Sequence, residues 1–347
     1  MTDKKYAVTL GEYMLRLRSP GFERFFQSPQ LEATFGGAEG NVAVSLANYK
    51  QPVKYVTAFP KNDIGEAAIK FLHYMGVDTS CIIRQGNRLG TYYVETGSGP
   101  RPSKVIYDRS HSAISEATFE DFDWGHIFAD ACWLHTTGIT PAISESAAEL
   151  TLKAINLAKE KKLQVSMDLN FRKKLWQWGK TSAEVMPEIV SNIDVVIANE
   201  EDIQKSLGIE LDQKIGGEAL NREKYHNLGK LVLEKFPDVQ IVAITLRESF
   251  SATHNDWGAI LIVRGEEKPY ISKKYELKSI VDRVGGGDSF GAGLIYALIN
   301  QYDYQSAIEF AVAASALKHT IPGDANRVTV EEVSRLLGGD SSGRVQR

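Results

Sequence analysis

The sequence predicts an α/β protein with a doubly wound, mostly parallel sheet and a small β-sheet that forms a lid. Strand-like and helix-like segments alternate through most of the 347 residues, which is typical of a parallel sheet with helices on both faces. Two segments, about 11–35 and 88–112, interrupt this alternation. Hydrophobic residues make up 43% of the chain, so a sizeable core can form.

The alternation can be followed along the chain. A strand over 53–58 leads into a helix from Asp63 to Met75, because apolar residues recur there at helical spacing and Gly76 can end the helix. The same patterns predict helices over 144–161, 184–191 and 225–235, and strands over 163–167, 194–198 and 240–245.

The two interruptions are rich in β-forming residues. Residues 14–34 are aromatic and basic without helical period, and the β-rich stretches 91–95 and 104–107 flank a turn segment over 97–102. Strands inserted into an α/β chain are candidates for a separate small sheet over a cleft. We therefore predict one domain over 1–338 that carries this lid, followed by a polar, flexible tail over 339–347.

Composition excludes several classes of protein. The net charge of −4 is too mild to indicate a nucleic-acid partner or an acidic membrane surface, and no uncharged apolar run could span a bilayer. The first residues lead into the strand 6–10 without the apolar region of a signal peptide. Cys81 and Cys132 have neither metal-ligand nor disulfide-framework spacing. We expect a cytoplasmic protein without nucleic-acid or membrane partners.

The most informative stretch is 280–294, where a short apolar segment meets Gly285, Gly286 and Gly287 and a helix follows. Glycines bring backbone N–H groups close to a ligand, and a helix N-terminus attracts an anion. The run is not a Walker A loop, because no Lys-Ser/Thr pair follows the last glycine. It is not the dinucleotide fingerprint either, because the last required glycine would fall on Phe290.

Asp288 follows these glycines directly. A carboxylate beside an anion site is repulsive unless it has a function there. In phosphoryl transfer, such a group orients the acceptor hydroxyl and accepts its proton. The alternative is that Asp288 only caps the helix and that the glycines only pack.

Residues 282–288 resemble the second signature of the PfkB carbohydrate kinases, Asp-x-x-Gly-x-Gly-Asp. The resemblance implies a ribokinase-like fold, an anion hole formed by the three glycines, and Asp288 as the catalytic base. Val284 and Gly286 replace the usual threonine and alanine, and neither change removes a backbone amide.

Residues 35–46 form a second strand-to-helix junction with glycines at its turn, which by itself suits a simple turn and amphipathic helix equally well. The stretch also resembles the first PfkB signature, and by that match Gly36, Gly37 and Asn41 face the sugar. Segments 58–65 and 76–79 match the family in spacing and type, so the resemblance extends from about Tyr6 to about Leu337.

Two arginines point to an acidic substrate. Arg109 follows the strand-like stretch 104–107, and Arg172 lies just past a strand end, where α/β folds bind ligands. The arginine fork binds a carboxylate in bidentate fashion, although a lone arginine is more often solvated. Segments 89–93, 107–109, 168–172 and 321–324 together resemble 2-keto-3-deoxygluconate kinases. That resemblance implies sugar contacts from Tyr92, Tyr107, Arg109, Asn170, Arg172 and Asp324, whereas the two tyrosines could equally pack within the lid.

The nucleotide side departs from the family pattern. The metal-associated motif Asn-x-x-Glu reads Asn199-Glu-Glu-Asp202 here, which leaves open whether Asp202 or Glu201 serves Mg²⁺ through water, or whether the acids only favour a helix start. Arg247 replaces the glycine of the family's Thr-x-Gly. The resemblance implies ATP contacts from Asn199, Thr245, Arg247, Gly285 and Gly287.

We therefore expect a kinase that transfers the ATP γ-phosphoryl group to the primary hydroxyl of 2-keto-3-deoxygluconate with Mg²⁺, and that assembles through its lid into a homo-oligomer. A dependence on a monovalent cation stays open. The alternatives are a kinase of 2-keto-3-deoxygalactonate, fructose or ribose, or a non-catalytic sugar-binding regulator. The intact glycines and Asp288 argue against the regulator.

Overall fold

The computed structural model describes residues 6–210 and 222–339. Its main sheet holds ten strands. In spatial order they are β13 (Tyr270–Ile271), β12 (His254–Val263), β11 (Ile241–Ser251), β10 (Val195–Ala198), β9 (Gln164–Asp168), β8 (Ala131–Thr137), β1 (Tyr6–Leu10), β4 (Val53–Phe59) and β5 (Ile82–Arg84), with β14 (Tyr275–Leu277) beside β12.

The strand order reverses at β1. This strand pairs in parallel with β4 on one side and with β8 on the other, and later strands continue outward in both directions. The antiparallel pairs in this sheet are those that β12 forms with β11, β13 and β14. Open α/β sheets bind ligands outside the carboxyl ends of the strands near such a reversal, so this edge is where a site is expected.

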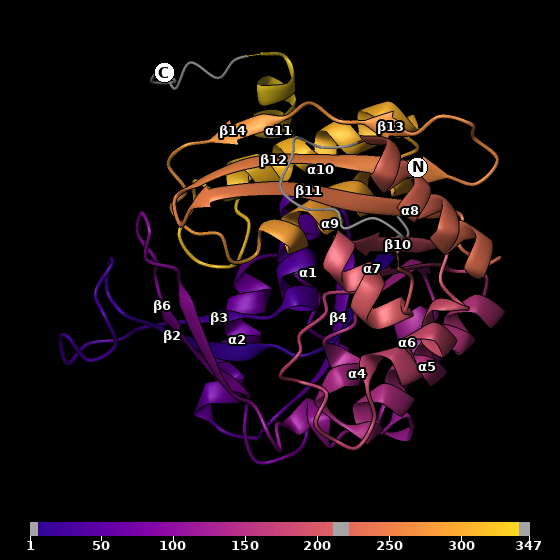
Figure 1. Cartoon of the computed structure of the whole chain (residues 1–347). Coiled ribbons are helices and arrows are strands. Elements are labelled where there is room, and N and C mark those ends of the chain that lie inside the picture. Colours follow the sequence, from indigo (N-terminus) through magenta and orange to yellow (C-terminus); the bar gives the residue numbers. More distant parts are fainter. Residues whose placement is uncertain (1–5, 211–221, 340–347) are drawn as a thin grey trace.

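Helices cover both faces of the sheet (Figure 1). Successive residues of a strand face opposite sides. Val195 and Ile197 accordingly pack into one core, whereas Val196 and Ala198 pack into the other. The first core is shared with α1 (Ala38–Asn48), α2 (Asp63–Tyr74), α9 (Gly286–Ile299), α10 (Tyr304–Lys318) and α11 (Val330–Leu337). The second is shared with α3 (Trp124–Phe128), α4 (Thr140–Ile143), α5 (Glu145–Glu160), α6 (Ser182–Val190), α7 (Glu200–Leu207) and α8 (Arg222–Lys235).

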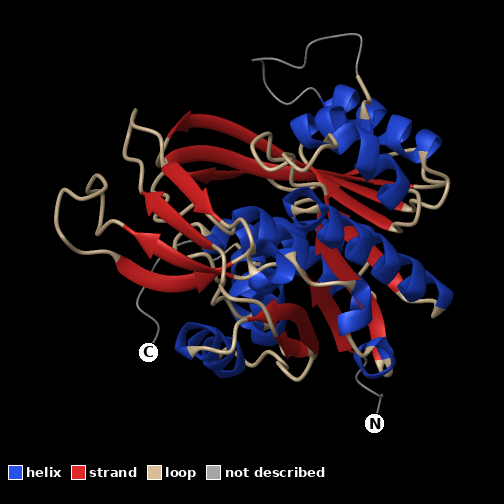
Figure 2. Cartoon of the chain, turned by 90° about the horizontal axis from the view of Figure 1, so that it is seen from below, coloured by secondary structure: helices blue, strands red, loops and turns tan. Residues whose placement is uncertain are grey.

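A separate four-stranded sheet stands beside the main one, as Figures 1 and 2 show. Its strands are, in order, β3 (Glu32–Gly36), β2 (Met14–Arg18), β6 (Thr91–Glu95) and β7 (Lys104–Asp108). The chain segments that interrupt the α/β alternation thus pair with one another, as predicted. Every residue of β7 is exposed, including the apolar Val105 and Ile106.

The predicted fold class is confirmed, and the predicted elements differ mainly at their ends. The strand predicted over 240–245 continues to Ser251, because its polar second half pairs antiparallel with β12. The helix predicted from residue 184 begins at Ser182, because Thr181 and Glu184 form a capping box. Apart from Gly339, the tail predicted over 339–347 lies outside the described residues. Within 6–210 and 222–339, no helix has the length and apolar character that crossing a membrane requires.

Candidate active site

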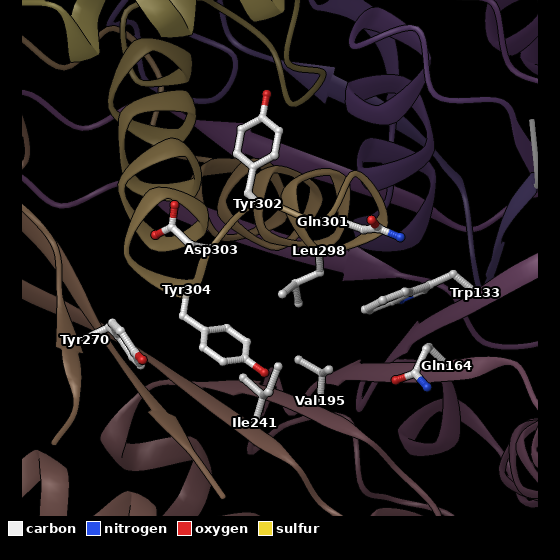
Figure 3. A pocket seen from close by; sticks show the side chains of 10 residues that line it. All are labelled: Trp133, Gln164, Val195, Ile241, Tyr270, Leu298, Gln301, Tyr302, Asp303 and Tyr304. Carbon is white, nitrogen blue, oxygen red and sulfur yellow. The ribbon is translucent and has the colours of Figure 1, made fainter. Parts of the chain in front are cut away.

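Two cavities lie at opposite edges of the main sheet. The cavity in Figure 3, of about 550 Å³, is lined by Trp133, Gln164, Val195 and Ile241 near the amino ends of their strands, together with Tyr270 and the segment after α9. The other, of about 820 Å³, is lined by Asp168 and Ala198 at the carboxyl ends of β9 and β10. We assign the active site to the second cavity, because it also contains the glycine loop and Asp288.

The glycine loop takes a shape that other residues cannot adopt. Gly285 has a φ of +82°, and a Cβ atom there would overlap the carbonyl oxygen of Asp324. Gly287 lies in the first turn of α9 and lines the cavity, where a Cβ atom would meet nothing. The first N–H groups of a helix have no intrahelical acceptor, so this turn can hold an anion.

Gly286 corrects one detail of the sequence prediction. It was expected to face the ligand, but it is buried and does not line the cavity, and a Cβ atom there would stand 2.5 Å from the His319 ring. Its backbone N–H group donates to the carbonyl oxygen of Arg283 at 3.3 Å, so this amide already has a partner within the loop. Gly286 therefore contributes close packing, while Gly285 and Gly287 border the cavity.

The two glycine-containing junctions meet at Asp288. Asn41, in the first turns of α1, donates from Nδ2 to Oδ2 of Asp288 at 2.7 Å, although 247 residues separate them. Burial raises the pKa of Asp288 to about 6, which the hydrogen bond from Asn41 partly opposes. Such a carboxylate is still ionised near neutral pH and can accept a proton.

This pKa predicts the pH profile of the reaction. Asp288 is active as a base only when it is deprotonated, so kcat/KM should be constant above its pKa and fall about tenfold per pH unit below about 6. Replacing Asn41 by alanine removes a bond to the charged form and should move this midpoint upward. Initial rates across a pH series check both points, and a flat profile from about pH 5 to about 8 would contradict the assignment.

The small sheet supplies one wall of the cavity. Tyr92 stacks against Tyr107 with ring centroids 6.0 Å apart, and the Arg109 guanidinium lies 5.5 Å from the Tyr107 centroid. Tyr92 also donates to Oδ2 of Asp324 at 2.5 Å. Gly36 does not line the cavity itself, but a Cβ atom there would overlap Tyr92 Oη. Its missing side chain makes room for the Tyr92–Asp324 pair.

Arg109 has a partner that the sequence did not predict. Its Nε donates to Oε2 of Glu12 at 2.6 Å, and both side chains are buried. Arginine has five N–H donors, so one carboxylate holds the side chain in place without using all of them. Arg172 is exposed, and its charge lowers the pKa values of Asp168, Asp202 and Asp288 against the larger effect of burial.

A buried group of charges lies behind the sugar side of the cavity. The Arg16 side chain, in β2, is 1% exposed and contacts Asp282 at 2.7 Å and Asp324 at 2.6 Å. Asp282 also accepts the backbone N–H groups of Val284 and Gly323, both at 3.1 Å. This group ties β2 to the glycine loop and to the loop that carries Asp324. The sequence did not predict a role for Arg16. Its partner Asp282 could have been recognised, because it is the first residue of the second signature.

Asn199, Asp202, Thr245 and Arg247 all line the other end of the cavity. Asp202 accepts the N–H groups of Asn199 at 3.0 Å and Phe171 at 2.9 Å, one on each carboxylate oxygen, and burial raises its pKa. It therefore caps α7 and holds the loop after β9. Asp168, missed from the sequence, also lines this region, and burial with neighbouring carboxylates raises its pKa well above the usual value.

The predicted site residues thus converge. Those that line the cavity are Gly37, Asn41, Tyr92, Tyr107, Arg109, Asn170, Arg172, Asn199, Asp202, Thr245, Arg247, Gly285, Gly287, Asp288 and Asp324. Within the described ranges, no three His, Cys, Asp or Glu side chains form a ready-made metal cage. The carboxylates of Asp168, Glu201 and Asp202 suit a cation that keeps most of its water, as Mg²⁺ does.

A helix N-terminus that can hold an anion, beside a carboxylate base and two arginines, defines a phosphotransferase that acts on a small polar substrate. The sequence model of the pfkB family carbohydrate kinases matches residues 4–330, and the chain belongs to this family.

Individual relatives match along nearly the whole chain. The crystal structure of 2-dehydro-3-deoxygluconokinase from Thermotoga maritima is 46% identical, with a TM-score of 0.90, covering 96% of this chain and 100% of that one. A 2-dehydro-3-deoxygalactonokinase from Haloferax volcanii is 30% identical, covering 97% of this chain and 98% of the relative. A putative ribokinase from E. coli, solved with ATP and Mg²⁺, shares the fold at 18% identity and a TM-score of 0.76, covering 96% and 99% of the two chains.

Proposed function

We propose that the protein phosphorylates 2-keto-3-deoxygluconate, also called 2-dehydro-3-deoxygluconate, with ATP and forms 2-keto-3-deoxy-6-phosphogluconate. One observation carries the proposal. Asp288 and the N-terminal turn of α9 line the same cavity as Arg109 and Arg172. One cavity thus combines a base and an anion site with groups that bind a carboxylate. The similarity to the Thermotoga maritima enzyme supports the same substrate.

The residues divide the reaction between them. Asp288 accepts the proton of the primary hydroxyl as that oxygen bonds to the γ-phosphorus and the bond to the β-phosphate oxygen breaks. The N–H groups of the first turn of α9 stabilise the charge on the transferring group. Asn41 holds the Asp288 carboxylate in one orientation. Mg²⁺, held through water by Asp202 or Glu201, would neutralise phosphate charge.

The sugar acid lies on the side of the small sheet. Arg109, fixed by Glu12, and the exposed Arg172 would bind its carboxylate. Tyr92, Asn170 and Asp324 offer hydrogen-bonding groups for the hydroxyls, and Gly37 also lines the cavity. Asn199, Thr245 and Arg247 would contact ATP at the other end. The Haloferax volcanii relative favours the epimer, 2-keto-3-deoxygalactonate, as the second candidate.

The assembly and location follow the sequence-based expectations. We propose a homo-oligomer, because Val105, Ile106 and Phe26 leave apolar surface exposed on the small sheet and the loop beside it. The small sheet would act as the lid of the cavity. We propose the cytoplasm as the location, because the chain has only two cysteines.

A substrate panel tests the proposal. The purified protein is assayed for ADP release with 2-keto-3-deoxygluconate, its galactonate epimer, fructose and ribose, with ATP and Mg²⁺ present. We expect kcat/KM for the gluconate acid to exceed that for either neutral sugar by at least about 30-fold, because a neutral sugar makes no charged hydrogen bonds to Arg109 and Arg172. A preference for fructose or ribose would overturn the acidic substrate, and no ADP release with any sugar would favour the regulator.

A further inference from the structure

Lys318 is a buried cation that the proposed reaction does not use. It is the last residue of α10, and its side chain is 0% exposed. Its Nζ donates to the carbonyl oxygen of Asp282 at 3.0 Å and to that of Ile321 at 3.4 Å. A buried ammonium group is costly unless its N–H groups and its charge are both compensated. These contacts therefore need an explanation beyond packing.

The two carbonyl groups belong to the two segments that build the active site. Asp282 begins the signature that continues into the glycine loop and Asp288. Ile321 begins the turn that leads to Asp324, whose carbonyl oxygen lies against Gly285. The Lys318 ammonium therefore holds the anion-binding loop and the sugar-side loop in one fixed relation.

The charges around Lys318 fit this role. Burial lowers the pKa of Lys318, whereas the carboxylates of Asp282, Asp324 and Asp288 favour its protonated form. Arg16 contacts Asp282 and Asp324 from the small sheet. Lys318 approaches Asp282 and Asp324 from α10, and its own hydrogen bonds go to backbone carbonyl oxygens and not to the carboxylates.

We propose that the Lys318 ammonium serves as a built-in monovalent cation at this junction. Carbonyl oxygens are also the ligands that K⁺ accepts, so the ammonium stands where a dissolved cation could otherwise bind. The protein would then need no dissolved monovalent cation, which answers the question that the sequence left open. Lys318 is a positioning residue, because it acts through the glycine loop and Asp324. This role rests on the proposed kinase activity and holds for either epimer.

Ion dependence tests the proposal. In a K⁺-free assay with tetramethylammonium as the counter-cation, the wild-type rate should change less than about twofold when K⁺ or NH₄⁺ is added at equal ionic strength. Lys318→Ala should lose at least about tenfold in kcat, because the carbonyl groups and carboxylates lose their cation. Added K⁺ or NH₄⁺ should restore most of this loss along a saturation curve, and tetramethylammonium should not.

Lys318→Met is the matched control, because its uncharged side chain fills the space and leaves no room for an ion. It should be impaired like Lys318→Ala and should not respond to ions. The melting temperature of Lys318→Ala should rise with K⁺ or NH₄⁺ more than that of the wild type, which is a readout independent of turnover.

Three outcomes would overturn the proposal. They are strong activation of the wild type by K⁺, full activity of Lys318→Ala without ions, and a folded Lys318→Ala that no ion restores. The wild-type measurement needs no variant, so strong activation by K⁺ would overturn the proposal even where Lys318→Ala fails to fold. All assays use the sugar that the wild type phosphorylates best, so an error in the proposed substrate leaves the ion test intact.

Discussion

Replacing Asp288 by asparagine should abolish turnover and leave the fold and both substrate sites nearly intact. The amide has the same shape, and its oxygen can still accept the hydrogen bond that Asn41 gives to Asp288 at 2.7 Å. It cannot accept the proton of the sugar hydroxyl. Losing a general base typically costs ~10²–10⁴-fold in rate, which kcat from an ADP-release assay would measure.

Asp303→Asn is the matched control. Asp303 caps α10 at the opposite edge of the sheet, and asparagine caps a helix equally well. Its activity should stay at the wild-type level, and calorimetric binding of ATP and sugar to Asp288→Asn should stay close to wild type. An Asp288→Asn variant that keeps more than about a tenth of the wild-type rate would show that another group is the base.

Replacing Arg109 or Arg172 by alanine should selectively weaken the acidic substrate. Truncating one partner of a buried charged hydrogen bond costs roughly 2–5 kcal/mol, so kcat/KM for the sugar acid should fall at least about 30-fold. The KM for ATP should barely change, because we assign both arginines to the sugar acid and not to the nucleotide. Lysine at either position should restore activity only partly, because a point charge cannot reproduce the fork.

The two arginines differ in their second effect. Arg109→Ala leaves the buried Glu12 without its cation and should also lower the melting temperature, whereas the exposed Arg172 should affect stability little. The double variant Arg109→Ala/Glu12→Gln separates lost binding from lost stability. Arg335→Ala, in α11 outside the cavity, is the control. If neither alanine variant changes the preference for sugar acids over neutral sugars, the arginines do not hold the carboxylate.

Local patterns in the sequence carry most of the fold. Buried strands such as 194–198 and capped helices such as 144–161 are visible as short periodic runs. Resemblance of two signatures predicted that Asn41 and Asp288 share a site, and the structure brings them into contact. The direction of Gly286 was not predictable, because it depends on where the first turn of α9 packs against His319.

The sequence alone could not predict which charged residues pair over long distances along the chain. Arg16 alternates with apolar residues in a strand, which predicts a solvated side chain, yet it is buried against residues 266 and more positions away. Glu12 and Arg109 are 97 residues apart, and neither has a local pattern that identifies its partner. Periodicity reports which face of an element is buried, but it does not report which charges meet there.

The Arg16 contacts have a consequence for how the protein folds during its synthesis. During synthesis, β2 leaves the ribosome when Asp282 and Asp324 do not yet exist. An arginine buried without its partners is destabilising by about 3–5 kcal/mol, so the N-terminal quarter of the chain cannot settle into its final packing at that stage. The small sheet can reach its native packing only after Asp324, which lies between α10 and α11, has been made. The N-terminal strand β2 therefore completes its packing late in synthesis, and a chain that ends before residue 324 lacks one of the two carboxylates that neutralise Arg16.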